Sequence, residues 1–592
     1  MGLDYILFHC KFTIPIATTL SIFYIPFLSR HDIYKIFTLI AIAVVATIPW
    51  DSYLIYTKIW TYPPDTVIGY TLFRIPLEEL FFFVIQTYIT SVIYCILTKS
   101  LIRPIYIRPT QTRQWVKDAG TICLISSAAI GIAFALSSGK MTYLGLILFW
   151  VSPVLLFQWL LTFDYLTALP WKVTALPICI PTLCLWVADA SAVRAGTWVI
   201  EKGTKLDYQI WDGLEIEEAV FFFLTNVMVV GGLIGCDYAF GIEELRRLCA
   251  KTDVQKKDIF LKDALLGIFK PLPGTDTAAK DELARAVKRL QAKSESMFLG
   301  SALFHGNLRI DLIFLYSFCR VVDDLVDDSG YDKEQARYWI RNCSIALNNR
   351  FKNDQTTGGA KFNDPTMALK YNELQSSVDH LPVSRLSREP LHDLLKGFEM
   401  DLEFDYTKGC FPIRDEVDLD LYASRVASTI AALILDLVYY YYYHNKPIHP
   451  PDHLEHVTKA GKEMGKALQL VNIARDIRRD AAIGRVYIPT SWLRETGLTP
   501  IDVIHRPTSA DVYRLQERLL EKANICYTAA RDTIEELPHS VRGPIRATVD
   551  SYMEIGRILR EKKGKNLEGA KLSVPLWRRL LVAWSAMLQK KY

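Results

Sequence analysis

The first 240 residues contain seven long apolar runs, and this pattern constrains the fold more than any other feature. A helix needs about 20 apolar residues to cross a bilayer, where helices and closed barrels alone satisfy every backbone hydrogen bond. The second and seventh runs are somewhat short. The runs lie near residues 5–28, 33–50, 78–98, 119–138, 142–163, 167–188 and 217–236. The sequence therefore predicts an integral, multi-pass membrane protein with a seven-span helical bundle over residues 1–240.

Basic residues gather in the loops after the first, third and seventh runs. Examples are Arg30, Arg103 and Arg246. Since Lys and Arg are enriched in cytosolic loops, we expect these three loops in the cytosol. The rest of the chain follows the seventh run and is predicted to be cytosolic too.

An internal repeat is visible within the apolar half. Four residues recur 138 positions later, namely Tyr5 as Tyr143, Pro15 as Pro153, Asp51 as Asp189, and Trp60 as Trp198. The pair Glu78-Glu79 recurs 139 positions later as Glu217-Glu218. The repeats cover about residues 1–100 and 140–240, with the fourth run as a connector. Each run of the first repeat matches the run four places later, and this offset is an even number of membrane crossings. Both repeats therefore have the same orientation, and both Glu pairs lie at the same end of the bundle.

The repeated glutamates have two readings. Acids in the first turn of a helix complement its dipole, and Pro76 suits a helix start. The recurrence of the Glu pair at one end of an apolar bundle favours a catalytic role instead, because carboxyls near hydrocarbon tend toward the neutral form. A neutral acid beside an alkene can donate a proton, and a second carboxylate can remove one. We take Glu78, Glu79, Glu217 and Glu218 as candidate catalytic residues.

The remainder of the chain has the composition of a helical domain without long apolar runs. Residues 241–290 are charged and predict a linker, and residues 291–592 show helical periodicity with little strand pattern. We expect an all-α domain there. The formal net charge of +4 gives no reason to expect nucleic acid as a partner. The 11 cysteines form no C-x-x-C pair, which indicates neither a zinc site nor a disulfide framework.

Two aspartate pairs carry the chemistry of this second half. Asp323 and Asp327 are four residues apart, as are Asp476 and Asp480, and both segments are predicted helices. Either pair alone also fits an exposed acidic helix face. Two such faces turned toward each other would bind Mg²⁺, which prefers a few carboxylates together with phosphate oxygens. Neighbouring arginines match phosphate geometry, so the pattern predicts chemistry on a diphosphate ester.

Further segments extend this pattern over about 200 residues. They are Ser294-Glu-Ser296-Met-Phe298, Asp323-Asp-Leu-Val-Asp327, Gly397-Phe-Glu399-Met-Asp401, Tyr422-Ala-Ser-Arg-Val-Ala427, Gln469-Leu-Val-Asn472-Ile-Ala-Arg475-Asp476-Ile-Arg-Arg-Asp480 and Gly484-Arg485-Val-Tyr487-Ile-Pro489. In these segments the C-terminal half resembles the phytoene and squalene synthases, which join two isoprenoid diphosphates head to head.

The apolar half resembles the small lycopene cyclases, whose repeated three-helix units carry a proline-x-Glu-Glu segment. Pro76-Leu-Glu78-Glu79 fits that pattern, and Glu215-Ile-Glu217-Glu218 lacks the proline. The order of cyclase then synthase over nearly the whole chain resembles the fungal bifunctional lycopene cyclase/phytoene synthases.

The synthase resemblance implies coupling of two geranylgeranyl diphosphates to phytoene through prephytoene diphosphate, a cyclopropyl intermediate. Mg²⁺, or Mn²⁺ as the alternative, would be held by Asp323, Asp327, Asp476 and Asp480. Tyr422 and Tyr487 are candidates for proton handling or cation stabilisation. The residues implied to bind diphosphate are Ser294, Ser296, Arg320, Arg475 and Arg485.

The cyclase resemblance implies β-cyclisation of lycopene end groups to γ- or β-carotene with no net redox change. We find no flavin or nicotinamide motif of the form G-x-G-x-x-G after a predicted strand, which separates this chain from the flavin-dependent cyclases. The expected partners are the two substrates, the lipid bilayer and a phytoene desaturase acting between the two steps.

Several alternatives remain open on the sequence. Asp323-Asp-Leu-Val-Asp327 also fits the D-D-x-x-D segment of head-to-tail prenyl synthases, and a squalene-type product is a further option. The apolar half could be a mere anchor, or a channel or transporter by topology alone. A retinal-binding receptor is disfavoured because the seventh run contains no lysine.

Overall fold

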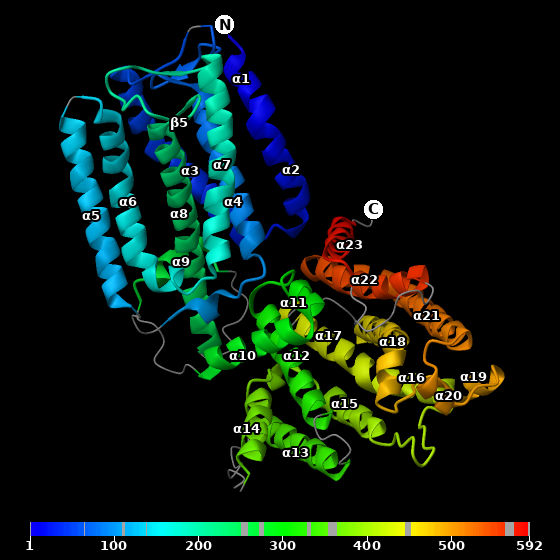
Figure 1. The fold of residues 1–592 in the computed structure, drawn as a ribbon. Helices are drawn as coiled ribbons and strands as arrows, with labels where there is room; N and C mark the ends of the chain where they lie inside the picture. Colours follow the sequence, from blue (N-terminus) through cyan, green and yellow to red (C-terminus); the bar gives the residue numbers. More distant parts are fainter. Residues whose placement is uncertain are drawn as a thin grey trace. The chain divides into compact units, whose positions relative to one another are not determined.

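Seven helices long and apolar enough to cross a membrane follow one another in residues 4–249 of the computed structural model (Figure 1). The first combines α1 (Asp4–Phe8), the π-helical turn η1 (His9–Thr13), α2 (Ile14–Tyr24) and the 3₁₀ turn η2 (Ile25–Phe27). The others are α3 (Arg30–Tyr56), α4 (Leu77–Thr98), α5 (Gln114–Leu136), α6 (Thr142–Leu166), α7 (Trp171–Ala195) and α8 (Ile216–Cys249). The predicted seven-helix bundle is confirmed.

The structure describes residues 2–63, 65–108, 113–137, 139–249, 259–270, 278–327, 333–352, 364–443, 451–562 and 574–589. The chain divides into two units, residues 1–280 (unit 1) and 281–592 (unit 2). The predicted linker 241–290 contains the end of α8, the short helix α9 (Leu261–Gly267) and most of α10 (Ala278–Lys293).

Six of the seven spans are longer than their predicted apolar runs, and α3 and α8 exceed them by the most. Helix α3 has 27 residues, since it begins at a capping box, in which Ser29 and Asp32 bond each other's backbone N–H groups, and continues past the apolar run to Tyr56. Helix α8 has 34 residues because it continues past its apolar stretch into a polar segment that contains Asp237 and Arg246. Helix formation therefore extends beyond the hydrophobicity that identifies a span.

Short strands connect the helices at one end of unit 1. Strands β2 (Thr71–Leu72) and β3 (Ile75–Pro76) form a hairpin before α4, and β5 (Gln209–Trp211) and β6 (Leu214–Glu215) form its counterpart before α8. Strand β1 (Trp60–Thr61) pairs with β4 (Val199–Ile200). Backbone hydrogen bonds thus join the two repeats directly.

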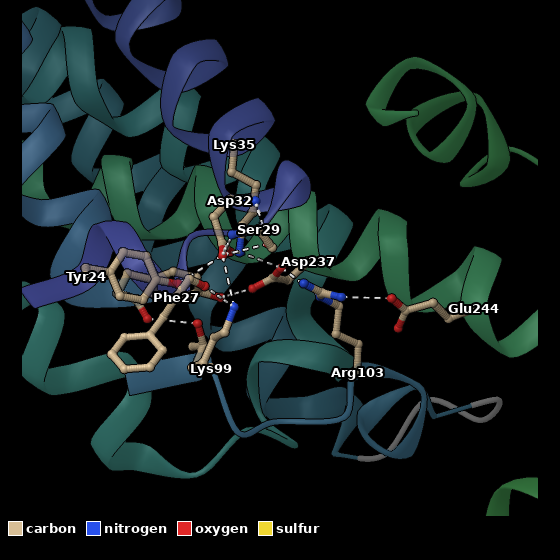
Figure 2. Close-up of polar contacts among 11 residues, drawn as sticks. Tyr24, Phe27, Ser29, Asp32, Lys35, Lys99, Arg103, Asp237 and Glu244 are labelled. Atoms are coloured by element: carbon tan, nitrogen blue, oxygen red, sulfur yellow. Dashed lines mark hydrogen bonds and ion pairs between the residues drawn. The ribbon is translucent and has the colours of Figure 1, made fainter. Parts of the chain in front are cut away.

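The opposite end of unit 1 holds a network of buried ion pairs (Figure 2). Lys35 Nζ lies 3.0 Å from Asp237 and 3.4 Å from Asp32. Arg103 bonds Asp237 at 2.9 Å and Glu244 at 2.8 Å. Three more groups complete the network. Lys99 lies 3.6 Å from Asp32, and the Tyr24 hydroxyl donates to Asp32 at 2.9 Å. The Tyr94 hydroxyl donates to Asp237 at 2.8 Å. Three bases therefore face three acids, which ties α3, α4 and α8 together.

Unit 2 is all-helical in its described part apart from one isolated bridge, Asp405 to Cys410, which confirms the predicted fold class. After α10 its helices are α11 (Glu295–Ser301), α12 (Gly306–Asp327), α13 (Lys333–Phe351), α14 (Pro365–Asp379), α15 (Arg388–Asp401), α16 (Glu416–Ala423), α17 (Thr429–Tyr443), α18 (Pro451–Ala482), α19 (Thr490–Glu495), α20 (Pro500–His505), α21 (Ala510–Arg531), α22 (His539–Lys562) and α23 (Leu576–Leu588). The short turns are η4 (Val383–Arg385), the π-helical η5 (Ser424–Ser428) and η6 (Asp532–Glu536).

An eighth segment, Glu416–Tyr443, is also long and apolar enough to cross a membrane by composition. It consists of α16, η5 and α17, which pack against α15 and α18. Leu433 and Leu437 are fully buried in the apolar core of unit 2. We therefore interpret this segment as a core helix of unit 2.

Candidate active sites

The four predicted glutamates of unit 1 lie in the first turns of two equivalent helices. Glu78 and Glu79 begin α4, and Glu217 and Glu218 begin α8. None is more than 5% exposed. Burial this deep is unusual for carboxyls and needs compensation.

The compensation is the same in both repeats. The Tyr5 hydroxyl donates to Glu79 at 2.5 Å, and the Tyr143 hydroxyl donates to Glu218 at 2.6 Å. The first glutamate of each pair accepts a backbone N–H instead. Glu78 accepts from Ile68 at 2.8 Å, and Glu217 accepts from Leu206 at 2.6 Å. The repeat seen in the sequence is thus a repeat of hydrogen bonds as well.

Aromatic contacts cross between the repeats at this end. Tyr5 of the first repeat packs on Trp198 of the second, with ring centroids 5.1 Å apart. Trp60 of the first donates its indole N–H to the Tyr143 hydroxyl of the second at 3.0 Å. Tyr62 adds a hydrogen bond to Glu79 at 2.8 Å. Both glutamate pairs therefore belong to one buried centre.

Two aspartates join the same centre. Asp51 is fully buried, and it interacts electrostatically with Glu79 and Glu218. Asp189 accepts the Trp198 indole N–H at 3.1 Å. Sequence reasoning used both aspartates, with Tyr5 and Tyr143, only as markers of the repeat. Their recurrence was the available signal.

Several carboxyl oxygens of this centre lack hydrogen-bond partners in the described part of the chain. They are Oε2 of Glu78, Oε2 of Glu217, both Oδ atoms of Asp51, and Oδ2 of Asp189. The partners that the other oxygens do have are hydroxyl, indole and backbone N–H groups. An apolar site with unsatisfied acid oxygens is suited to proton transfer rather than to holding the fold.

In unit 2 the predicted acids lie on two helices, with Asp323 and Asp327 at the end of α12 and Asp476 and Asp480 near the end of α18. Arginines bond three acids of these clusters. Arg320 contacts Asp323 and Asp324 at 2.5 Å each, and Arg475 contacts Asp476 at 2.5 Å. Arg485 lies 3.4 Å from Asp327. The structure therefore brings the predicted arginines to the predicted acids.

Asp401, at the end of α15, holds both predicted tyrosines. It accepts hydrogen bonds from the Tyr487 hydroxyl at 2.7 Å and from the Tyr422 hydroxyl at 3.3 Å. The two rings stack with centroids 4.9 Å apart. Sequence reasoning quoted Asp401 within a matching segment but assigned it no role.

Asp401 interacts electrostatically with members of both aspartate pairs. Burial and then the neighbouring Asp327 charge raise the pKa of Asp323 to about 6, and Asp401 contributes to this shift. Burial and then Asp476 raise the pKa of Asp480 to about 7, again with a contribution from Asp401. Burial raises the pKa of Asp401 itself to about 6. The acids thus repel one another and favour a cation among them.

The predicted serines lie at the start of α11. Ser294 is the N-cap, and its side chain accepts the Met297 N–H at 3.4 Å. Ser296 lies within α11, and its side chain is outside the described residues. Tyr316 of α12 lines the cavity of this unit.

A cavity of about 380 Å³ lies among α11, α12, α17, α18 and α22. Its walls are mainly apolar, with Leu312, Ile430 and Met464 as examples. Gln469 and Asn472, which belong to the predicted acid segment of α18, lie at its wall. The cavity therefore adjoins the acid clusters and can hold long hydrocarbon chains.

The acid clusters suit Mg²⁺ bound together with a diphosphate. Within the described ranges, no three His, Cys, Asp or Glu side chains converge closely enough to enclose an ion by themselves. Mg²⁺ characteristically uses one or two carboxylates plus substrate phosphates rather than an all-protein cage. Paired carboxylates on two helices, with arginines beside them, fit that mode.

Comparison with known proteins agrees with this geometry. The squalene/phytoene synthase family matches residues 290–578. Three full-length relatives carry the name "Bifunctional lycopene cyclase/phytoene synthase". The protein of Arthroderma gypseum is 48% identical and covers 99% of this chain and 100% of its own length. Those of Gibberella fujikuroi and Aspergillus oryzae are 45% and 42% identical, covering 99% and 100% of this chain and 100% of their own. The chain therefore belongs to the family of fungal bifunctional lycopene cyclase/phytoene synthases.

Proposed function

We propose that the chain catalyses two steps of carotenoid biosynthesis: phytoene synthesis in residues 291–592 and lycopene cyclisation in residues 1–240. The relatives' shared name supports the pair of activities. The observation that carries the proposal is the presence of two acid centres beside apolar walls, a buried one in unit 1 and a partly exposed one in unit 2.

In unit 2, Asp323, Asp327, Asp476 and Asp480 would hold Mg²⁺, or Mn²⁺ as the alternative. The ion would stabilise the negative charge that develops on the departing diphosphate. Arg320, Arg475 and Arg485 would bind the diphosphate oxygens. Ser294 and Ser296 would also bind the diphosphate. The apolar cavity would exclude water from the allylic cation during the two-step coupling through prephytoene diphosphate.

Proton loss completes phytoene formation. Tyr422 and Tyr487 share Asp401 as acceptor, so a proton reaching either hydroxyl can pass to a buried carboxylate. Their stacked rings also present π-electron density to a nearby cation. We assign the pair this role of proton handling and cation stabilisation.

In unit 1, one carboxylic acid would protonate the terminal alkene of lycopene, and a second carboxylate would take a proton after ring closure. One proton enters and one leaves, so the reaction has no net redox change and requires no flavin or nicotinamide. Glu78, Glu79, Glu217 and Glu218 would supply these groups, with at least one glutamate per repeat being essential.

The bilayer and a desaturase complete the proposed setting. Eight helices are apolar enough to span a membrane, and seven of them form unit 1. The basic loops place unit 2 in the cytosol in this proposal. Phytoene and lycopene would exchange through the lipid with a phytoene desaturase, which is the expected functional partner.

The test uses membranes containing the full chain, supplied with geranylgeranyl diphosphate or with lycopene. A chelator of divalent metals should abolish phytoene formation and leave lycopene cyclisation unchanged. Asp480→Asn should reproduce the chelator's effect, and Glu218→Gln should remove cyclisation alone. Loss of both reactions in either variant, with the protein still folded, would contradict the assignment of one reaction to each unit.

A further inference from the structure

The two repeats of unit 1 differ beside their shared acid centre. An apolar pocket of about 370 Å³ lies between α2, α4 and α7. Its mouth is exposed on the outside of the helices, where Ile96, Ile180 and Cys184 lie. Its floor is buried and includes Leu185 and Ala188. The pocket thus extends from the exposed side of these helices to Ala188, which directly precedes the buried Asp189 in α7.

The equivalent position in the other repeat is filled. Ala188 corresponds to Trp50 and Phe12 corresponds to Trp150, each 138 residues away. Trp50 and Trp150 stack with centroids 4.9 Å apart, and Trp150 continues the stack onto Phe221. The pocket between α2, α4 and α7 is therefore open where α7 carries the small Ala188, whereas the equivalent place in the other repeat is packed where α3 carries Trp50.

The first span has a second asymmetry at the same place. Residues His9–Thr13 form a π-helical turn, a feature found often at functional sites. The Thr13 hydroxyl, which lines the pocket, contacts His9 Nδ1 at 3.0 Å, and His9 Nε2 contacts the Glu78 carbonyl at 3.1 Å. The equivalents in regular helix α6 are Ile147 and Val151. A chain of polar contacts thus links this pocket to the backbone of Glu78, at the start of α4.

Gln86 adds a polar atom to the pocket wall. Its amide N–H donates to Thr225 at 3.1 Å, while its buried Oε1 has no hydrogen-bond partner in the described part of unit 1. Gln86 and Thr225 are themselves equivalent positions, so they meet where the two repeats face each other. A carbonyl dipole without a partner can stabilise positive charge that develops in a neighbouring hydrocarbon.

We infer that this pocket receives one end of the polyene substrate, and that the bundle has a single substrate pocket for its two repeats. The inference rests on the proposed cyclase function. A hydrocarbon has no polar atoms to pair, which fits an almost wholly apolar lining, and its remaining length can stay in the lipid outside the mouth. A two-ring product then requires each end of the molecule to enter the same pocket in turn.

Matched tryptophan variants in the two repeats test this inference. Cys184 lines the pocket, and its exposed counterpart in α3 is Ala46. We expect Cys184→Trp to lower lycopene conversion about 100-fold, since obstruction misplaces the reacting end. Ala46→Trp should stay near the unmodified rate. Ala188→Trp, which copies the packed repeat, should abolish conversion, and Leu183→Trp on the exposed face of α7 is a second control.

Each result has one meaning. If the unmodified chain does not cyclise lycopene, the proposed function fails before the pocket is tested. If it cyclises lycopene and Cys184→Trp does so equally well, the pocket is not the substrate site. Equal losses in Cys184→Trp and Ala46→Trp would contradict a single pocket. Unfolding temperatures in detergent identify variants that fail to fold, and Cys184→Trp alters an exposed side chain, so it remains informative if Ala188→Trp unfolds.

Discussion

The two ends of unit 1 both bury acids, and they treat them in opposite ways. At the end that contains Asp237, three acids meet three bases, and lysine, arginine and tyrosine groups occupy the carboxylates (Figure 2). At the end that contains Glu79, the four glutamates and Asp189 have tyrosine, indole and backbone N–H groups as partners, and several carboxyl oxygens have none in the described residues. A lysine pairs there only with Glu215 among the described buried acids of that end.

We interpret this difference as that between a structural site and the proposed reactive site. A buried charge that is paired and hydrogen-bonded holds its helices in register, and its proton does not move. A buried carboxyl with an oxygen left unsatisfied destabilises the fold, and such groups are retained where proton transfer needs them. The following variants test that distinction.

The largest effect on stability is expected for Lys35→Met, at the end of unit 1 that contains Asp237. Lys35 is 1% exposed and contacts both Asp32 and Asp237, so its loss leaves buried negative charge uncompensated. We expect a loss of about 3–5 kcal/mol in the free energy of unfolding, measured by thermal unfolding in detergent. Lys172→Met, at an exposed position of α7, is the control. An unchanged unfolding temperature would remove the structural role of the network.

The glutamates should show the reverse pattern. Replacing Glu78, Glu79, Glu217 or Glu218 singly by Gln keeps the shape and removes the acid. We expect at least one variant in each repeat to lose about 10²–10⁴-fold in lycopene conversion, with no fall in unfolding temperature. Glu201→Gln, exposed at the same end, should convert lycopene normally. Full conversion by all four variants would leave the glutamates as helix-start residues.

A smaller effect is expected for the hydroxyls that bind these acids. Tyr5→Phe and Tyr143→Phe each remove one hydrogen bond to a buried carboxyl, so each should lower stability by about 1–3 kcal/mol. Tyr143→Phe also leaves the Trp60 indole N–H without its acceptor, so its loss of stability should be the larger. Cyclisation should fall in both. Comparing the two variants tests whether both repeats take part in cyclisation. A loss of activity confined to Tyr5→Phe would show that the second repeat has only a structural role.

The smallest effect, with the opposite sign, is expected for Asp51→Leu. Both Asp51 oxygens are buried without partners among the described residues, so an apolar side chain of similar size should stabilise the bundle by about 1 kcal/mol. Its activity should fall if Asp51 shares a proton with the glutamates. A less stable protein would show that water or a bound ion already satisfies this group.

Hydropathy and the internal repeat predicted the membrane-spanning helices and part of the residues in each candidate site. Seven spans follow from apolar runs, and the paired glutamates follow from their recurrence. The extension of α8 to Cys249 did not follow, because a helix continues through polar residues when tertiary ion pairs satisfy them. The lesson for span prediction is that hydrophobicity marks the lipid-facing part and not the helix ends.

The missing site residues share a physical reason. Asp401 and Asp51 interact with groups that are distant in sequence, Tyr487 and Glu218 respectively. No spacing rule on one helix connects them. The contrast between Trp50 and Ala188 was readable from the repeat, but its meaning depends on a cavity that only packing reveals.

The length of α8 relates the chemistry to the membrane itself. Glu217 and Asp237 are 20 residues apart on this helix, or about 30 Å at 1.5 Å per residue. That distance is close to the thickness of the hydrocarbon layer. The ion network and the acid centre would then sit at opposite boundaries of the lipid, so a thinner or thicker bilayer would change the depth at which a dissolved polyene meets the acids. Lipid composition thereby becomes a variable of the reaction, alongside substrate concentration.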